Sequence, residues 1–423
     1  MRDATQALTV LAEIDPTRRA LLDDRLAAIA DDLDRNAVFR PRDLPDTHFM
    51  RFVIIEDREL PALLAWESNH DNDASEYLAA AVRAAPGLDQ IFECCCDYPA
   101  RRDDDMRVAW LLDHSVRAAA FYTGYRGVSR AQVVNDRRIH DAIREALDRP
   151  GGRAALAGLP GSEIQRRLCE YVRTTYPELD TSVQDDDETR WATSKLLAIA
   201  AGIVLLPALL LVALPWYFTL RVKEKRDDAD RNTRPVHDDK GLAAFEDLDG
   251  VTQNQLTHVV DIKPGRFRFA TLWFVLFVLD IIARAWEVRG KLGGITSIHF
   301  ARWVIVRDRR RVRRKRHRLV FFSNYDGSWE SYLGEFVDRA AFGLTGVWSN
   351  TVGFPRTERL LGAGAHDEEA FKNWTRRHQI RTQVWWSGVP DSTVQNVRAD
   401  VWIRRNLDRG LPDDEVTAWL RKL

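Results

Sequence analysis

An internal repeat is the feature that most constrains this chain. Residues 48–58 read HFMRFVIIEDR and residues 299–309 read HFARWVIVRDR, so His, Phe, Arg, an aromatic residue, two β-branched residues, Asp and Arg recur in register. Residues 63–78 and 318–333 match again, each with an apolar run followed by Ser-Asn, an Asp and a closing Tyr-Leu. Self-similarity over such a separation indicates that one supersecondary unit occurs twice in the chain.

Each copy has the pattern of a mixed unit of strands and helices. In the second copy, the apolar runs at 299–306 and 318–324 predict strands, and Ser328 is a typical N-cap for a helix that follows. Further strands are predicted at 344–350 and 382–388, with a helix between them at 367–378. This order is that of a ferredoxin-like split β-α-β unit.

Two such units in one chain predict an α+β fold in which the two sheets pack face to face as an intrachain pseudo-dimer. The predicted division of the chain is N-terminal helices at 1–45, a first ferredoxin-like unit at 46–148, a helical linker at 149–194 and a second ferredoxin-like unit at 298–423.

The most apolar segment of the chain lies between the copies. The stretch from Leu196 to Leu220 has no charged residue and is flanked by basic residues. A bilayer core about 30 Å thick needs roughly 20 helical residues, so we predict a transmembrane helix over 195–220. Trp216 and Tyr217 near its end suit the headgroup level. A helix buried in a soluble core is the alternative interpretation.

A second apolar segment follows a polar connection at 221–267. Extended to spanning length it covers 268–287 and includes Asp280 and Arg284, which are four residues apart and can pair on one helical face. We predict a second membrane helix here, with a helix that lies in the membrane interface as the alternative.

The predicted location is the cell membrane, with both ferredoxin-like units on the cytoplasmic side. The N-terminus has no apolar leader, which argues against a cleavable signal peptide. Three of the four cysteines are adjacent, at 94–96, which does not suit a secreted disulfide framework. If the copies pair, the second unit lies on the same side as the first.

The duplicated architecture resembles the dimeric α+β-barrel superfamily, which includes the dye-decolorising peroxidases and the chlorite dismutases. Two stretches carry the resemblance further. Residues 246–253, EDLDGVTQ, are similar to the way such peroxidase domains open, and residues 323–327, SNYDG, end like their distal Gly-x-x-Asp-Gly motif, with Ser323 in place of the first glycine.

The resemblance implies a haem cofactor and a set of site residues. Asp326 would be the distal acid–base group, and a histidine would hold the iron from the other side, with His366 and His378 as the two candidates. An alternative reading of Asp326 and Gly327 is a tight turn before a capped helix.

A basic run lies between two predicted strands of the second copy. It is a candidate for attraction to anionic lipid headgroups, with a solvated hairpin tip as the alternative. The formal net charge of the whole chain is −1, so nucleic acid is not an expected partner. The candidate residues are Arg309, Arg310, Arg311, Arg313, Arg314, Lys315 and Arg316.

Two functions of different class are compatible with these patterns. The first is a membrane-attached module that binds lipid or a partner through the tandem units. The alternative is a membrane-bound oxidoreductase or peroxidase-like enzyme, haem-dependent, that acts on a lipophilic small molecule between the sheets. The chain has no metal-spacing motif or phosphate-binding loop at a strand–helix junction, and this favours the binding module.

Overall fold

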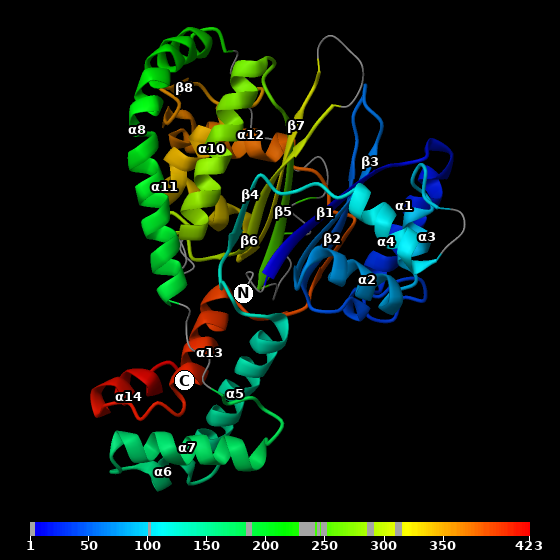
Figure 1. The fold of residues 1–423 in the computed structure, drawn as a ribbon. Helices are drawn as coiled ribbons and strands as arrows, with labels where there is room; N and C mark the ends of the chain where they lie inside the picture. The colour runs from blue at the N-terminus through cyan, green and yellow to red at the C-terminus, as the bar shows by residue number, and fades with distance from the viewer. Residues whose placement is uncertain are drawn as a thin grey trace.

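The fold is centred on two four-stranded antiparallel sheets, seen in the computed structural model (Figure 1). The structure describes residues 5–99, 103–182, 188–227, 252–285, 292–308 and 315–423, together with Leu242 and Glu246. The first sheet has the order β1 (Thr5–Glu13), β3 (Leu63–Asp71), β2 (Thr47–Ile55) and β10 (Val384–Ser387). The second has the order β4 (Ala120–Thr123), β6 (Ile298–Val306), β7 (Arg318–Asp326) and β5 (Gln253–Asp261).

The two halves of the chain exchange their last strands. Strand β4 comes from the first half but pairs with β6, with Ala120 opposite Trp303. Strand β10 comes from the second half but pairs with β2, with Val384 opposite Phe52. Each sheet is therefore completed by the other half, whereas the sequence predicted two self-contained units.

The sheets pack face to face through small and β-branched side chains. Val53 and Ala65 of the first sheet lie in one buried cluster with Val304, Val320 and Phe322 of the second. Because side chains alternate along a strand, the other face of each sheet is left for helices. The predicted pairing of two sheets is thus present, although it is made by interlocked halves.

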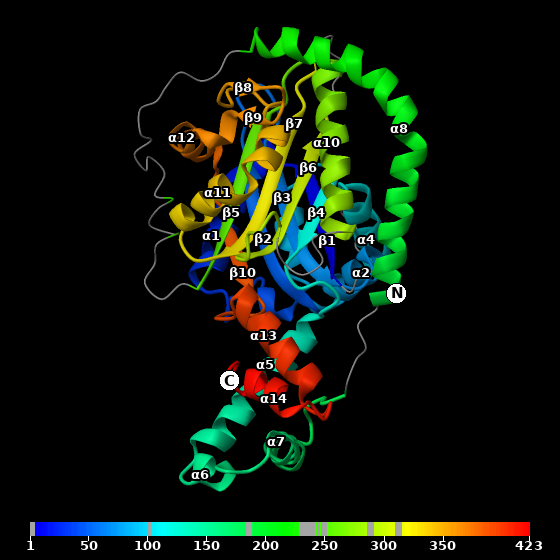
Figure 2. The same ribbon diagram turned by 90° about the vertical axis from the view of Figure 1, so that its left-hand side faces the viewer.

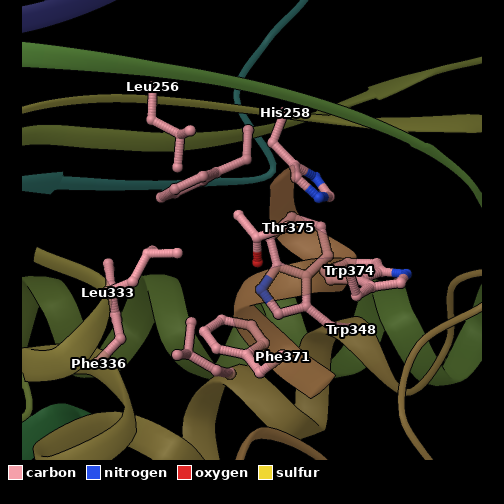
Figure 3. Close-up of a pocket in the computed structure, with 10 residues that line it drawn as sticks. Leu256, His258, Leu333, Phe336, Trp348, Phe371, Trp374 and Thr375 are labelled. Carbon is pink, nitrogen blue, oxygen red and sulfur yellow. The ribbon is translucent and has the colours of Figure 1, made fainter. Parts of the chain in front are cut away.

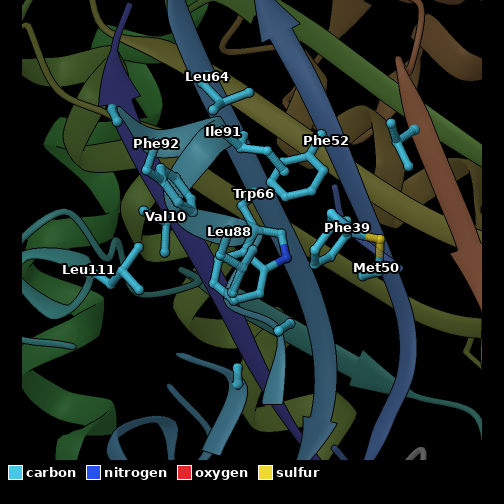
Figure 4. Close-up of a cluster of buried hydrophobic side chains, with 14 of the residues drawn as sticks. Val10, Phe39, Met50, Phe52, Leu64, Trp66, Leu88, Ile91, Phe92 and Leu111 are labelled. Atoms are coloured by element: carbon cyan, nitrogen blue, oxygen red, sulfur yellow. The ribbon is translucent and has the colours of Figure 1, made fainter. Parts of the chain in front are cut away.

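Helices α1 (Arg19–Asp31), α2 (Ala74–Ala84), α3 (Leu88–Phe92) and α4 (Asp104–Asp113) cover the first sheet, with short 3₁₀ turns at Pro16–Arg18 and Pro41–Asp43. Their shared core is aromatic: Trp66 stacks on Phe52 and meets Phe92 (Figure 4). The structure differs here from the predicted helical N-terminus at 1–45, because Thr5–Glu13 is a strand whose register with β3 places Val10 opposite Trp66.

The outer face of the second sheet is covered by α10 (Arg266–Ala285), α11 (Trp329–Trp348) and α12 (Glu368–His378). A small hairpin of β8 (Thr357–Glu358) and β9 (Gly362–Ala363) and a 3₁₀ turn (Gly364–His366) connect α11 to α12. The strand predicted at 344–350 is instead largely the end of α11. A side chain at Gly346 would lie 3.1 Å from Leu361 and 3.5 Å from Val275, so glycine lets this helix approach its neighbours.

A helical extension projects from one end of the sheets (Figure 2). It consists of α5 (Arg130–Asp148), α6 (Gly152–Leu156), α7 (Gly161–Thr175), α13 (Val394–Asn406) and α14 (Asp413–Leu420). A hydrogen bond and an ion pair join α5 to α13: His140 Nδ1 lies 2.5 Å from Asp400, and Arg404 Nε lies 2.7 Å from Asp136. Asp136 and Asp400 each lie seven residues after the helix N-cap, so the repeat extends into this region.

The membrane-spanning predictions are wrong. Within the described ranges, no helix is long and apolar enough to cross a bilayer. This overturns the transmembrane helix over 195–220, the second membrane helix over 268–287, the transmembrane part of the predicted fold class and the anchored location at the cell membrane. One side of helix α10 packs inside the protein, since Leu272 and Leu276 are fully buried in the core of the second half. Helix α8 (Glu188–Glu224) packs on the protein through its last turns, where Leu220 is fully buried and Glu224 accepts hydrogen bonds from the N–H groups of Arg359 and Leu360.

Candidate functional site

The predicted acid–base residue Asp326 has both carboxylate oxygens engaged. Oδ1 lies 2.7 Å from Nε2 of His299, and Oδ2 accepts a 2.8 Å hydrogen bond from the backbone N–H of Val394, the first residue of α13. His299 is fully buried, and its Nδ1 lies 3.3 Å from the hydroxyl of Tyr125. Asp326 therefore fastens the start of a helix to the end of a strand.

The first copy contains the same arrangement. Asp71 Oδ1 lies 2.9 Å from Nε2 of His48, and Asp71 Oδ2 accepts a 2.8 Å hydrogen bond from the N–H of Arg130 at the start of α5. A carboxylate is favourable at a helix N-terminus because of the free N–H groups and the positive end of the helix dipole. The occurrence of the same Asp–His–helix contact in both halves supports a structural role for Asp326, since a single catalytic site would use only one of them.

The two histidines proposed as iron ligands lie elsewhere. His366 ends the 3₁₀ turn before α12, with its ring 5.0 Å from that of Phe342. His378 ends α12, where Nδ1 lies 2.9 Å from the carbonyl oxygen of Trp374. Neither is among the hydrogen-bond or ionic partners found for Asp326 in the described part of the chain.

The residues around His378 do not fit haem. The cavity near it is about 10 Å³, which is room for roughly one water molecule. Its walls are large apolar side chains, among them Trp348, Phe371 and Trp374 (Figure 3). A porphyrin would require most of this core to move, so no step is assigned to such a cofactor.

A charged layer fills part of the space between the sheets. Glu67 lies between two arginines, with Oε2 2.9 Å from Nε of Arg51 and Oε1 2.6 Å from Nη2 of Arg302. All three side chains are 1% exposed or less. The two arginines are equivalent in the repeat, so one carboxylate of the first copy pairs with a guanidinium from each half.

The remaining arginine donors are satisfied across the interface in a mirrored way. Nη2 of Arg51 donates to the carbonyl oxygen of Ser323 and to Oδ1 of Asn324, at 2.9 and 2.6 Å. Nη2 of Arg302 donates to the equivalent oxygens of Ser68 and Asn69, at 2.9 and 2.7 Å.

The second copy has a phenylalanine at the position of Glu67. The layer thus holds two guanidinium groups and one carboxylate, with Phe322 under Arg51 at 5.5 Å. Burial lowers the pKa of Arg51, and it lowers that of Arg302 to about 10. This layer and the apolar cluster therefore fill the space between the sheets at the positions of their own residues.

The first copy also buries a neutral histidine at the end of β3. His70 stacks on Tyr77 with ring centroids 3.8 Å apart, as Tyr325 stacks on Tyr332 in the second copy. Burial, and after it the charge of Arg302, lowers the pKa of His70 to about 3. The unfolded chain would protonate this residue near its ordinary pKa of about 6.5.

We therefore expect His70 to make the protein acid-sensitive. Because the pKa of His70 is lower in the folded protein than in the unfolded chain, its contribution to the free energy of unfolding is complete above pH 6.5. This contribution is lost as the pH falls from 6.5 toward 3, by about 1.4 kcal/mol per pH unit. The variant His70→Phe keeps a stacked ring but cannot titrate. Urea unfolding at several pH values should show a weaker acid dependence for this variant, and an unchanged slope would contradict the assignment.

Most of the predicted headgroup-binding residues lie outside the part of the chain that the structure describes. Arg309, Arg310, Arg311, Arg313 and Arg314 lie outside the described residues. Lys315 is exposed. Arg316 forms an ion pair with Asp57 of the first half at 3.0 Å and another with Asp261 of its own half at 2.7 Å.

An exposed apolar face is formed by α8 and α10. The sequence predicted both segments as membrane helices, with a helix buried in a soluble core and a helix in the membrane interface as the respective alternatives. On α10, Trp273 and Phe277 stack in parallel at 5.6 Å although they are 52% and 47% exposed. Trp216 of α8 joins the helices by donating a 3.1 Å hydrogen bond to Thr271. We call this the α8–α10 face; its exposed members are Leu196, Leu197, Ile199, Val204, Leu210, Leu211, Val212, Leu214, Phe218, Val222, Trp273, Phe274 and Phe277.

Basic side chains gather at one end of the α8–α10 face. Lys223 lies over the ring of Phe267 at 5.8 Å, and Arg307 lies over the ring of Phe269 at 5.9 Å. Three further basic residues, Lys225, Arg226 and Arg266, are exposed at the end of α8 and the start of α10. The positively charged end of the face therefore lies where the β6–β7 connection approaches α10.

Comparison with known proteins assigns this chain to no family. No family model, no curated protein and no solved structure matches it. The geometry described above is therefore the basis for any functional assignment.

Sequence analysis missed the Arg51–Glu67–Arg302 layer. Its signal was present in the repeat, since an arginine recurs at the same place in two otherwise apolar strands. A charge at an inward position of a buried strand indicates a paired, buried ion.

Proposed function

We propose that this protein is a binding module that lies on anionic lipid surfaces through the α8–α10 face. The observation that carries the proposal is the combination of this exposed apolar face with a basic group at one end. A helix that lies on a lipid surface does not need to cross it, because only one side enters the boundary between headgroups and acyl chains.

The exposed residues suit such a surface. Contiguous apolar patches beyond a few hundred square ångströms are rare on monomeric proteins and mark interaction sites. Trp273 supplies an amphipathic ring, which is favourable at the headgroup level, and Phe277 supplies apolar surface for the acyl-chain boundary. Lys225, Arg226 and Arg266 supply positive charge, and each basic residue near an anionic surface contributes about 1 kcal/mol.

The filled interior supports a binding role over the enzymatic alternative. An enzyme acting on a lipophilic molecule between the sheets needs a concave pocket of some hundreds of cubic ångströms. The sheets are instead closed by the Arg51–Glu67–Arg302 layer and by apolar contacts such as Val53 with Val304.

Removal of the aromatic pair should weaken lipid binding. The double variant Trp273→Ser/Phe277→Ser is expected to bind vesicles of phosphatidylcholine and phosphatidylglycerol roughly tenfold or more weakly. The reason is that binding no longer transfers the two aromatic side chains from water into the lipid. The measurement is co-sedimentation of the purified full chain with vesicles. The matched control is Leu21→Ser/Leu112→Ser, which alters two exposed apolar residues away from this face and should bind as the parent does. Equal binding by both double variants would refute the proposal.

Removal of basic charge should weaken binding in a salt-dependent way. Lys225→Gln/Arg226→Gln should lower the affinity for anionic vesicles roughly 20- to 30-fold at low salt, since two charges contribute about 1 kcal/mol each. Vesicles of phosphatidylcholine alone should bind parent and variant equally weakly. If the parent fails to bind anionic vesicles, or forms a dimer that covers Trp273, the lipid assignment is wrong.

A further inference from the structure

One buried position on the outer side of the sheets, in β1 and β5, differs in polarity between the two copies. His258 in β5 lies opposite Phe321 in the strand register, and Val10 in β1 lies opposite the equivalent Trp66. His258 therefore takes the position that a fully buried valine occupies in the first copy. The change replaces an apolar core residue by an imidazole.

The neighbouring helix carries a matching change. Helices α4 and α12 correspond, because His114 and His378 each place Nδ1 against the carbonyl oxygen of the tryptophan four residues earlier, at 2.8 and 2.9 Å. Three residues before each histidine stand Leu111 in the first copy and Thr375 in the second. Two apolar residues that fill one core are thus replaced by two polar ones in the other.

These polar groups face a small cavity. His258 is 1% exposed and Thr375 is 3% exposed, and both line a cavity of about 10 Å³, into which they point in Figure 3. Neither ring nitrogen of His258 nor Oγ1 of Thr375 has a hydrogen-bond partner among the described residues. The rings of Trp348 and Trp374 lie 4.8 and 4.6 Å from the imidazole and close the other sides.

An unsatisfied buried polar group costs free energy, and three such atoms around one cavity call for a shared partner. The partner must be neutral, because no carboxylate lines the cavity and burial holds the pKa of His258 well below its ordinary value. A metal ion is disfavoured, since the described residues contain no group of three His, Cys, Asp or Glu able to hold one. The volume admits about one non-hydrogen atom.

We propose that this cavity is a binding site for a single water molecule that bridges His258 and Thr375. The neutral imidazole and the hydroxyl can each donate or accept, so one water satisfies a nitrogen of His258 and Oγ1 of Thr375 together. The water couples β5 to α12 in the second half, where the first half has Val10 and Leu111 in one buried apolar cluster.

The test is a double-variant cycle on the full chain, with His258→Val and Thr375→Val. Each single change removes one of the two hydrogen-bond partners of the water. Each should therefore lower the equilibrium constant for folding about tenfold, as measured by urea unfolding. The double variant should regain most of that loss, because no polar group then remains. As a control, His258→Val combined with Thr5→Val in the other sheet should show additive effects.

A crystal structure at a resolution that shows ordered water gives the second readout. A density peak within hydrogen-bond distance of both His258 and Thr375 supports the site. Additive effects of the two changes overturn the proposal, as does density that shows the cavity filled by a shifted side chain.

Discussion

Replacing Glu67 by glutamine is expected to lower the free energy of unfolding by about 3–5 kcal/mol. The change keeps the size of the side chain but removes the only carboxylate that contacts Arg51 and Arg302 in the described layer. Two guanidinium groups that are almost fully buried would then face each other without a counter-charge. An uncompensated buried charge is among the few causes of so large an effect from one substitution.

Urea unfolding of the full chain measures this loss. The control is Glu59→Gln, because Glu59 is 70% exposed and its 3.2 Å ion pair with Arg316 should contribute less than about 1 kcal/mol. If both variants unfold at the same urea concentration as the parent, the layer does not contribute to stability as the geometry requires.

Asp71→Asn and Asp326→Asn are expected to destabilise the protein by similar amounts, about 2–3 kcal/mol each. Each change removes the charge from a carboxylate that holds a buried histidine and accepts a hydrogen bond from the start of a helix. Since the two sites are copies of one arrangement, the two variants should lose similar amounts of unfolding free energy.

The comparison distinguishes a structural role from a catalytic one. Asp24→Asn, at an exposed position of α1, should change stability by less than about 0.5 kcal/mol and serves as the control. A near-neutral effect of Asp326→Asn beside a large effect of Asp71→Asn would show that Asp326 is not an anchor and would reopen its assignment as a reacting group.

The membrane prediction failed for a reason that composition does not reveal. An apolar run of spanning length is equally consistent with a span and with a helix packed on a protein core. In α10 the deciding contacts are those of Leu272 and Leu276 with the second sheet, and these depend on residues far away in the chain. The pairing of Asp280 with Arg284, at 2.8 Å, is present as the four-residue spacing predicted.

The candidate site was predictable only in part. His48 and His299 recur in register in the repeat, and the structure shows each of them in contact with the aspartate at the end of the next strand. Haem ligation by His366 or His378 followed from resemblance alone. It stays a prediction: the cavity of about 10 Å³ described above is lined by neither histidine, and its walls leave no room for a porphyrin.

The sequence by itself determined that the chain contains one unit twice, and the paired strands lie almost entirely within the repeated segments 48–58, 63–78, 299–309 and 318–333. Local pattern suffices there, since alternation of side chains and turn residues acts over a few positions. Only the tertiary structure decided that β4 and β10 are exchanged. A strand has the same sequence pattern whether it completes its own sheet or that of the other half. The choice depends on which edge is within reach, and it is made by contacts between residues more than a hundred positions apart, such as Ala120 with Trp303.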